Sequence, residues 1–261
     1  MVQVTYKKKG IRLTHIWFAN ADELQRLTKG KSHTDILFVH AGKYSHSSNS
    51  VMISKQDSLI KDLNCSEEDI WNSYGKHLKA YIKRSQREET VIRIFRGEEI
   101  NAGLLDVCGD LYEQMKASKG IPDTFNRSLA EQYIKKDALV ICVAYVNEIP
   151  VGFNAYIADD THFRTWLTAF AFCEEECDAQ VVSRAHQLLE WETMRYCCQN
   201  GITSYDFGGV ANFEEPNGID KFKMNFAKEG QRISYDNYLV GISLLGKVVI
   251  RGYKLIKKAR K

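Results

Sequence analysis

The chain contains stretches in which apolar and polar residues alternate with a period of two, and this pattern predicts β-strands. Four short stretches of this kind lie in the first sixty or so residues, separated by polar turns, and predict a sheet. The clearest signal covers residues 138–172, where turns at 147–148 and 159–160 join three apolar stretches into a predicted antiparallel meander. The predicted strands span residues 2–6, 13–18, 36–40, 50–53, 91–96, 138–146, 150–158, 163–172, 202–207 and 232–240.

A period near 3.6 residues predicts helices between these strands. Ser66 is the predicted N-cap of a helix that runs to about Arg84, with Asp69 at the capping-box position. The segment 179–200 has one apolar face, from which Trp191 points away. Further helices are predicted over residues 103–119 and 127–135, and around Lys221.

Length and composition are those of an ordinary soluble chain. At 261 residues it can bury a full core as one large domain or two small ones, and no linker or repeat separates modules. Neither a secretion signal nor a membrane span is expected, because no apolar run has the required length and position. The net charge of +3 is too small to indicate a partner.

Seven cysteines, an odd number, fit free thiols in a reducing cytoplasm better than a disulfide framework. Cys173 and Cys177 would need two further ligands nearby to hold a metal ion, and the sequence shows no such cluster. We therefore expect no metal.

The strand predicted over residues 202–207 ends in Tyr205-Asp206-Phe207 and runs into the glycine pair Gly208 and Gly209. Glycines at this point leave main-chain N–H groups open to a ligand, although a turn alone would also explain them. Asp206 has two interpretations: it orients or deprotonates an amine, or it caps the loop through backbone N–H groups.

These residues, followed by Gly218-Ile219-Asp220-Lys221-Phe222-Lys223 and by Phe226, resemble the signature of the FemABX-like branch of the GNAT acyltransferases. The run Leu-Leu-Glu-Trp-Glu at 188–192 is similar as well, and the predicted order of elements in the second half is that of a GNAT domain. The resemblance covers the C-terminal half well and the N-terminal half loosely. It implies an α+β fold with a mixed sheet, in which a degenerate GNAT-like lobe (residues 1–100) packs on a GNAT acyltransferase core (residues 101–261) that ends in a basic tail.

In GNAT enzymes the pyrophosphate of acyl-CoA lies on N–H groups at the start of the helix after the fourth strand, where the helix dipole favours an anion. Gln180, Ser183, Arg184 and Ala185 resemble the corresponding pattern in part, and the resemblance implies that they bind the coenzyme. Ser183 stands where the first glycine is expected. An ordinary amphipathic helix start is the alternative interpretation.

Lys223 falls where FemABX-like enzymes carry a lysine that partners an oxyanion or a phosphate, and the resemblance implies that role here. Phe226 takes the place of the usual GNAT tyrosine acid, so no tyrosine acid is expected there. Asp206 and Lys223 are thus the candidate catalytic residues. The candidate substrate-binding residues are Gly208, Gly209, Lys221, Phe222, Trp191 and Arg84.

Three further groups have an ordinary and a functional interpretation. The basic helix end with Lys83, Arg84 and Arg87 either complements the helix dipole or binds phosphate. His186 lies one helical turn before Glu190, and a surface i,i+4 pair is the simpler interpretation. The tail, residues 247–261, has seven basic residues and no acidic one, and is a solvated helix packed by its apolar side, a contact with anionic lipid, or a tRNA contact.

The sequence and the resemblance together predict a cytoplasmic N-acyltransferase. It would move an acyl group from acyl-CoA, with acetyl-CoA as the first choice, to the amine of a nucleotide- or lipid-linked amino-sugar in cell-envelope polysaccharide biosynthesis. The alternative donor is aminoacyl-tRNA, with a peptidoglycan precursor as acceptor and a basic face that reaches the tail. A membrane contact of the tail would place the protein at the inner face of the membrane, and a catalytically inactive binding protein is the third alternative.

Overall fold

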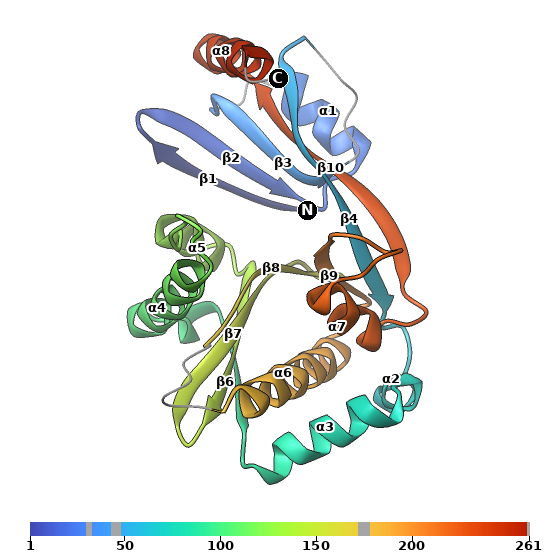
Figure 1. Cartoon of the computed structure of the whole chain (residues 1–261). Coiled ribbons are helices and arrows are strands. Elements are labelled where there is room, and N and C mark those ends of the chain that lie inside the picture. Colours follow the sequence, from blue (N-terminus) through green and yellow to red (C-terminus); the bar gives the residue numbers. More distant parts are fainter. Residues whose placement is uncertain (30–32, 43–47, 172–177, 260–261) are drawn as a thin grey trace. The chain divides into compact units, whose positions relative to one another are not determined.

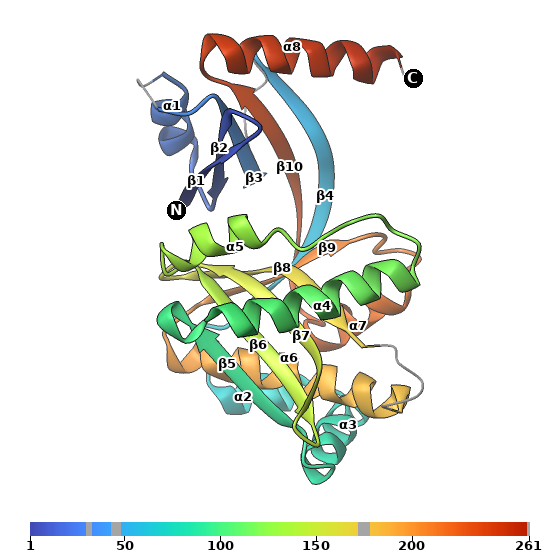
Figure 2. The same cartoon turned by 90° about the vertical axis from the view of Figure 1, so that its left-hand side faces the viewer.

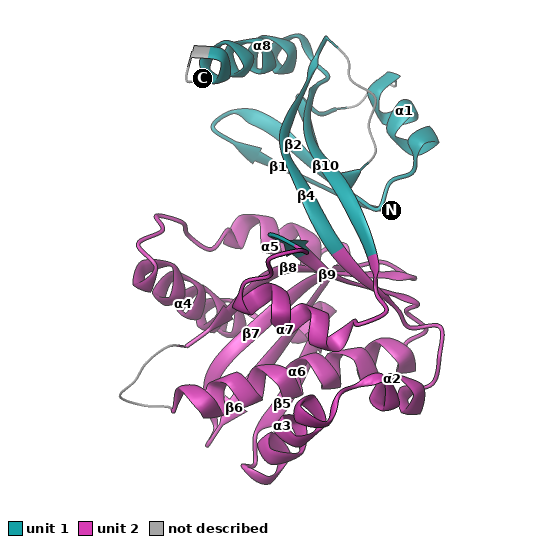
Figure 3. Cartoon of the chain, turned by 45° about the vertical axis from the view of Figure 1, so that its right-hand side comes forward, with its two compact units in different colours: residues 1–58, 209–212, 232–261 teal, residues 59–208, 213–231 magenta. Residues whose placement is uncertain are grey.

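The computed structural model describes residues 1–29, 33–42, 48–171 and 178–259 (Figure 1, Figure 2). Cys173 and Cys177 lie outside the described residues. The chain forms two compact units, which Figure 3 shows in different colours. Unit 1 comprises Met1–Ser58, Gly209–Asn212 and Arg232–Lys261, and unit 2 comprises Leu59–Gly208 and Phe213–Gln231. These segments differ from the two lobes expected from the sequence, whose boundary near residue 100 stays a prediction.

Unit 1 is built on a mixed set of strands. β1 (Val2–Lys8) and β2 (Ile11–Trp17) form an antiparallel hairpin, and β2 pairs parallel with β3 (Ile36–Gly42). β3 pairs antiparallel with β10 (Gln231–Gly241), and β4 (Ser50–Asp62) lies next to β10. The helices of this unit are α1 (Ala21–Lys29) and α8 (Leu244–Ala259). Its main core consists of Ile16, Leu24, Leu37, Val39, Tyr238 and Val240.

Unit 2 contains the antiparallel meander predicted over residues 138–172. The strands β5 (Val91–Arg96), β6 (Leu139–Val146), β7 (Ile149–Ala158) and β8 (His162–Phe170) pair antiparallel in this order. β9 (Ser204–Val210) then pairs parallel with β8. Asn147 and Glu148 have φ values of 50° and 63°. Two consecutive positive values are what a tight two-residue hairpin turn requires, so the predicted turn is confirmed.

Helices cover both faces of the sheet in unit 2. Figure 1 and Figure 2 show α4 (Ala102–Ser118) and α5 (Arg127–Ile134) on one face and α6 (Ala179–Gln199) on the other. The helix α3 (Lys76–Arg87) packs on α6. α7 (Gly218–Phe226) follows β9, and its N-cap Asn217 accepts hydrogen bonds from the N–H groups of Ile219 and Asp220. A 3-10 turn spans Gly97–Glu99.

The N-terminal half differs from the sequence prediction in three elements. The single helix expected from Ser66 to about Arg84 is two helices, α2 (Glu67–Ser73) and α3, because Tyr74 has an extended backbone and Gly75 is the N-cap of α3. α1 was not predicted. β4 extends well beyond the predicted residues 50–53. The capping box of Ser66 and Asp69 is confirmed.

Candidate active site

A cavity of about 220 Å³ opens in unit 2 beside the C-terminal part of β8. β8 and β9 pair in parallel from His162 and Ser204 to Arg164 and Asp206. The β8 residues that line the cavity follow Arg164 in the sequence. In a parallel pair, side chains at the carboxyl ends of the strands meet at one edge, which is where ligands commonly bind. The lining residues come from α4, β8, α6, β9 and α7: Met115, Lys119, Thr165, Thr168, Ala169, Phe170, His186, Glu190, Phe207, Ile219, Phe222 and Lys223.

His186 and Glu190 lie in the wall of this cavity rather than on an open surface. The imidazole is stacked between Phe170 and Phe222, with ring centroids 4.0 and 4.1 Å away. Its Nε2 atom lies 3.7 Å from Oε1 of Glu190, and the two side chains expose only 22% and 5% of their surface. The interpretation of this pair as a surface pair is therefore wrong.

Buried hydrogen-bond donors hold the carboxylate of Glu190. The amide of Asn154 donates to Oε1 at 2.9 Å, and the hydroxyl of Tyr205 donates to Oε2. The hydroxyl of Tyr156 lies 2.9 Å from that of Tyr205 and accepts a second hydrogen bond from Asn154 at 2.8 Å. Burial, together with the charge of Glu190, raises the pKa of Tyr205 well above its ordinary value, so Tyr205 stays a donor. The network fixes the carboxylate that faces His186.

Lys223 projects into the cavity from α7. Burial lowers the pKa of its ammonium group from the ordinary value of 10.5. The negative charges of Glu190, Asp220 and Asp206 oppose that shift, while Arg164 adds to it. Lys223 is thus a partly dehydrated cation among carboxylates, and such an environment is frequent at functional sites.

Asp206 does not line the cavity. Its carboxylate forms an ion pair with Arg164, in which both side chains are buried, with exposures of 7% and 3%. Its Oδ1 atom also accepts a hydrogen bond from the N–H group of Gly208 at 2.8 Å. Gly208 has a φ of +71°, a conformation that favours glycine. This geometry fits the loop-capping interpretation of Asp206, and its catalytic role stays a prediction.

The residues expected to bind a coenzyme do not share one surface. Gln180 and Ser183 are exposed near the start of α6, whereas Arg184 and Ala185 are buried. Arg184 forms a bidentate ion pair with Glu88 at 2.8 and 2.6 Å. The carboxylate of Asp178 caps the helix by accepting from the N–H group of Gln180 at 2.7 Å. Their role in coenzyme binding stays a prediction.

The residues expected to bind substrate are likewise dispersed. Phe222 lines the cavity, and Lys221 on the same helix is exposed. Trp191 is 8% exposed and packs against Trp71, with ring centroids 5.1 Å apart. Arg84 on α3 pairs with Glu88, the C-cap of that helix, at 2.9 Å.

The glycine pair is divided between the two units. Gly208 ends the strand portion in unit 2, and a Cβ atom there would lie 3.2 Å from the carbonyl oxygen of Thr165. Gly209 belongs to unit 1, and a Cβ atom there would lie 2.3 Å from Nε2 of Gln56. The positive φ and the nearby backbone oxygen favour glycine at 208, whereas at 209 the flexible side chain of Gln56 could move aside. Contact of either glycine with a substrate stays a prediction.

Within the described ranges, no group of three or more His, Cys, Asp or Glu residues could hold a metal ion. The described cysteines Cys65, Cys108, Cys142, Cys197 and Cys198 are free thiols. Phe226 is 1% exposed and packs edge-on against Tyr74, at 5.4 Å between centroids.

A family model described as an acetyltransferase (GNAT) domain matches residues 72–224. The fold is similar to the crystal structure of FemX, with a TM-score of 0.60 and 12% identity over 97% of this chain and 86% of that one. It is also similar to the C-terminal domain of a proposed lysylphosphatidylglycerol synthetase from Agrobacterium fabrum, with a TM-score of 0.55 and 9% identity over 97% and 85% of the two chains. L-PGS from Bacillus licheniformis gives a TM-score of 0.51 and 11% identity over 95% and 83%. No curated protein matches the chain by sequence.

Proposed function

We propose that the chain, which belongs to the acetyltransferase (GNAT) domain family, acylates an amine that is held in the cavity of unit 2. The family match and the fold shared with FemX confirm the α+β GNAT fold and the FemABX-like resemblance inferred from residues 201–230. They also confirm the class of enzyme, an N-acyltransferase. The residues that act, the donor and the acceptor are the subject of the proposal.

The His186–Glu190 pair carries the proposal. An amine must lose a proton when it attacks an acyl carbonyl, and a histidine is the usual side chain to accept it. Because Nε2 is the ring nitrogen 3.7 Å from the carboxylate of Glu190, we assign the ring proton to Nε2, which leaves Nδ1 to accept the proton of the amine. The carboxylate then stabilises the imidazolium that forms.

In the proposed reaction the amine nitrogen bonds to the acyl carbon, and the bond from that carbon to the leaving group breaks. His186 takes the proton of the amine and then gives it to the leaving group, which departs in its neutral form. Negative charge develops on the carbonyl oxygen, and a cation in a site that excludes water stabilises such charge strongly. Lys223 is the cavity cation that we assign to this oxygen or to an anionic group of the substrate.

The acceptor that we propose is an amino-sugar of a cell-envelope glycan precursor. Aromatic rings of Phe170, Phe207 and Phe222 line the cavity together with Thr165 and Thr168. The Oγ1 atom of Thr165 is buried without a hydrogen-bond partner among the described residues. A ligand with both an apolar ring face and hydroxyl groups would match this combination of apolar walls and a few polar groups.

Acyl-CoA is the proposed donor, because it is the general donor of the GNAT family. Aminoacyl-tRNA is the second candidate, and the cap of α6 favours it. The Asp178 carboxylate occupies the start of the helix, where GNAT enzymes place a pyrophosphate, and an anion there opposes a second anion. The fold is also shared with a protein named as a lysylphosphatidylglycerol synthetase, whose product name denotes an aminoacylated lipid.

Two measurements test the donor. A ligand present at about a hundred times its dissociation constant stabilises a protein by about 2.7 kcal/mol, so thermal unfolding with CoA, acetyl-CoA and charged tRNA will report the donor that binds. Acyl transfer to a panel of amino-sugars and nucleotide-linked amino-sugars is then followed with that donor. No transfer with either donor class, to any amino-sugar or peptidoglycan precursor, would leave the inactive binding protein as the better description.

The His186→Gln variant tests the base. We expect its turnover to fall by about 10²–10⁴-fold, the usual contribution of a general base. His162→Gln is the matched control, because His162 pairs with Asp159 at 2.9 Å on an exposed turn outside the cavity. If His186→Gln keeps turnover within a few-fold of the control, the assignment of His186 is wrong.

A further inference from the structure

The helix α8 of unit 1 exposes an apolar side. Among its large apolar residues, Leu244, Val248 and Leu255 expose 81%, 58% and 69% of their surface, and Leu245 and Ile256 expose 50% and 56%. A helix of a water-soluble domain normally turns its apolar stripe inward and its charges outward. α8 instead leaves most of its large apolar side chains exposed to solvent.

The buried side of α8 is narrow. Ile250 is fully buried and packs with Ile36 and Val51. At about 100° per residue, Leu244, Val248 and Leu255 fall within about 40° of one another, and Ile250 lies about 140° from their centre. The exposed apolar residues thus lie on the side of the helix that faces away from the core of unit 1. The expectation that the tail packs by its apolar side holds only for this narrow strip.

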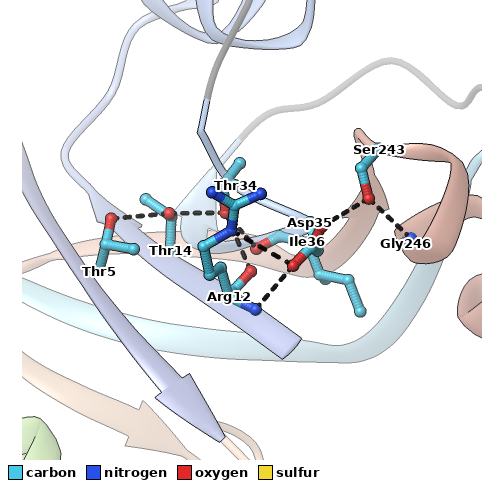
Figure 4. Close-up of polar contacts among 8 residues, drawn as sticks. All are labelled: Thr5, Arg12, Thr14, Thr34, Asp35, Ile36, Ser243 and Gly246. Atoms are coloured by element: carbon cyan, nitrogen blue, oxygen red, sulfur yellow. Dashed lines mark hydrogen bonds and ion pairs between the residues drawn. The ribbon is translucent and has the colours of Figure 1, made fainter. Parts of the chain in front are cut away.

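Figure 4 shows the polar contacts that fix the orientation of α8. Ser243 Oγ accepts a hydrogen bond from the N–H group of Gly246 at 3.0 Å and donates to Oδ1 of Asp35 at 2.7 Å. The hydrogen bond from Ser243 is the largest cause that lowers the pKa of Asp35, so this acceptor stays charged. A Cβ atom on Gly246 would lie 1.8 Å from the carbonyl oxygen of Asp35. The first turn therefore lies against the Asp35 backbone, and the helix cannot rotate to bury Leu244 without losing this contact.

The charges of α8 have one sign. Lys247, Arg251, Lys254, Lys257 and Lys258 are its charged residues, and Leu244–Ala259 contains no acidic residue. Lys254 and Lys257 donate to the carbonyl oxygens of Ser48 and Met52 at 2.8 and 3.0 Å, which ties the helix to unit 1 a second time. Lys247, Arg251 and Lys258 fall about 40–80° to one side of the exposed apolar centre. The exposed side therefore has an apolar strip with a basic border.

We propose that α8 is a membrane-surface helix that binds anionic lipid, with its exposed apolar strip among the acyl chains and its basic border at the headgroups. Helices of this kind lie in the plane of the interface and combine apolar burial with attraction to anionic lipid. No helix in the described part of the chain is long and apolar enough to cross a membrane. The contact is therefore peripheral, and it does not rest on the proposed acyl transfer.

Two other occupants fit the surface less well. A second copy of the chain would bring the same positive charges against this border, and like charges close together repel. An RNA would match the basic residues and Tyr253, which is 39% exposed, but it would leave the aliphatic side chains of Leu244, Val248 and Leu255 without an apolar partner. Anionic lipid matches both the charges and the aliphatic strip.

The test is sedimentation of the full chain with vesicles of phosphatidylcholine alone and of phosphatidylcholine mixed in equal parts with phosphatidylglycerol. We expect binding to the mixed vesicles only. Leu255→Gln with Ile256→Gln should weaken binding by about tenfold or more through lost apolar burial. Lys247→Gln, Arg251→Gln and Lys258→Gln together should weaken it about a hundredfold, because each basic residue at an anionic surface is worth about fivefold.

Matched controls lie on unit 2. Ile121→Gln with Ile149→Gln removes two isoleucines of similar exposure, 44% and 46%, and should bind as the parent does. Lys76→Gln, Lys135→Gln and Lys136→Gln remove three exposed charges outside α8 and should lower binding much less than the α8 set. Apart from the half-buried Lys247, the substituted residues are exposed, and unchanged circular dichroism will establish that the variants are folded.

Each contrary outcome overturns the proposal. Absence of binding to the anionic vesicles does so, as does equal binding by the α8 variants and their controls. A dimer in solution that Leu255→Gln with Ile256→Gln dissociates would make this side a protein interface. Binding of tRNA without vesicle binding, lost in the charge variant alone, would make it a nucleic-acid surface.

Discussion

Replacement of Asp206 by asparagine should destabilise the protein severely. Asp206→Asn keeps an oxygen for the N–H group of Gly208 but removes the charge that faces Arg164, whose side chain is only 3% exposed. Breaking a buried ion pair by removing the charge of one partner costs about 3–5 kcal/mol. In a chain of this size each kcal/mol lowers the unfolding temperature by about 2–4 °C, so a fall of about 6–20 °C is expected.

A second substitution separates the loss of the charge pair from a loss of chemistry. Arg164→Met replaces the buried cation by an apolar side chain of similar length, and the replacement of both members of an ion pair by apolar or neutral groups often costs little stability. The double variant Asp206→Asn, Arg164→Met should therefore recover most of the lost stability. Circular dichroism during heating measures the stability of each variant, and acyl transfer is then measured at a temperature where all variants are folded.

The result also decides between the two interpretations of Asp206. If Asp206→Asn unfolds within about two degrees of the parent, the buried pair contributes less than about 1 kcal/mol and the structural argument fails. If the double variant regains stability but not turnover, Asp206 takes part in the reaction, as the family resemblance implied. Recovery of both would leave Asp206 as a residue that shapes the site without touching the substrate.

Three further predictions concern buried ionisable groups. Lys223→Met should stabilise the protein at neutral pH, since burial lowers the pKa of the lysine below 10.5. This gain in stability should shrink as the pH rises from the lowered pKa towards 10.5, because the buried lysine of the parent then loses its charge. Urea unfolding of both proteins measures the gain, and a gain that does not change with pH would contradict the prediction. Burial lowers the pKa of His15 from 6.5 to about 4, so His15 binds its proton more readily in the unfolded chain. The free energy of unfolding should therefore fall by about 3 kcal/mol as the pH drops from 6.5 to 4. His15→Phe should reduce this fall, and an unchanged slope of stability against pH would refute the assignment. Tyr205→Phe removes a donor from buried Glu190 and should cost about 1–3 kcal/mol of stability as well as turnover, whereas normal turnover would show that Glu190 needs no such support.

Local patterns predicted most of the regular structure, because their physical cause is local. The strand over residues 91–96 and the meander are found within a few residues of their predicted bounds. α1 was missed although Asn20 and Glu23 form a reciprocal cap, in which each side chain accepts from the backbone N–H group of the other. That spacing is visible in the sequence, so this element could have been predicted.

Other elements depend on contacts that the sequence does not display. Most of the second half of β4 is exposed or half-buried, with no strict alternation to mark it as a strand. His186 and Glu190 have the spacing of a common surface pair, and only the tertiary fold places the imidazole between Phe170 and Phe222. Because these three residues are far apart along the chain, no pattern in a single sequence predicts that they come into contact. The sequence therefore predicted the helix that contains His186 and Glu190, but it wrongly placed the two side chains on the protein surface.

The triplet Tyr205-Asp206-Phe207 explains why the recognisable motif and the cavity coincide. Successive residues of a strand point to opposite faces, so Tyr205 and Phe207 share one face, where their rings lie 4.8 Å apart. Tyr205 holds Glu190, Phe207 lines the cavity, and Asp206 binds Arg164 at the last paired position of β8 and β9. The side chain of Asp206 thus lies where the pairing of β8 and β9 ends. The side chains of Tyr205 and Phe207, on either side of it in the sequence, help to form the site. The acid in the motif therefore marks where the cavity begins, even though its own carboxylate is directed at Arg164 and Gly208.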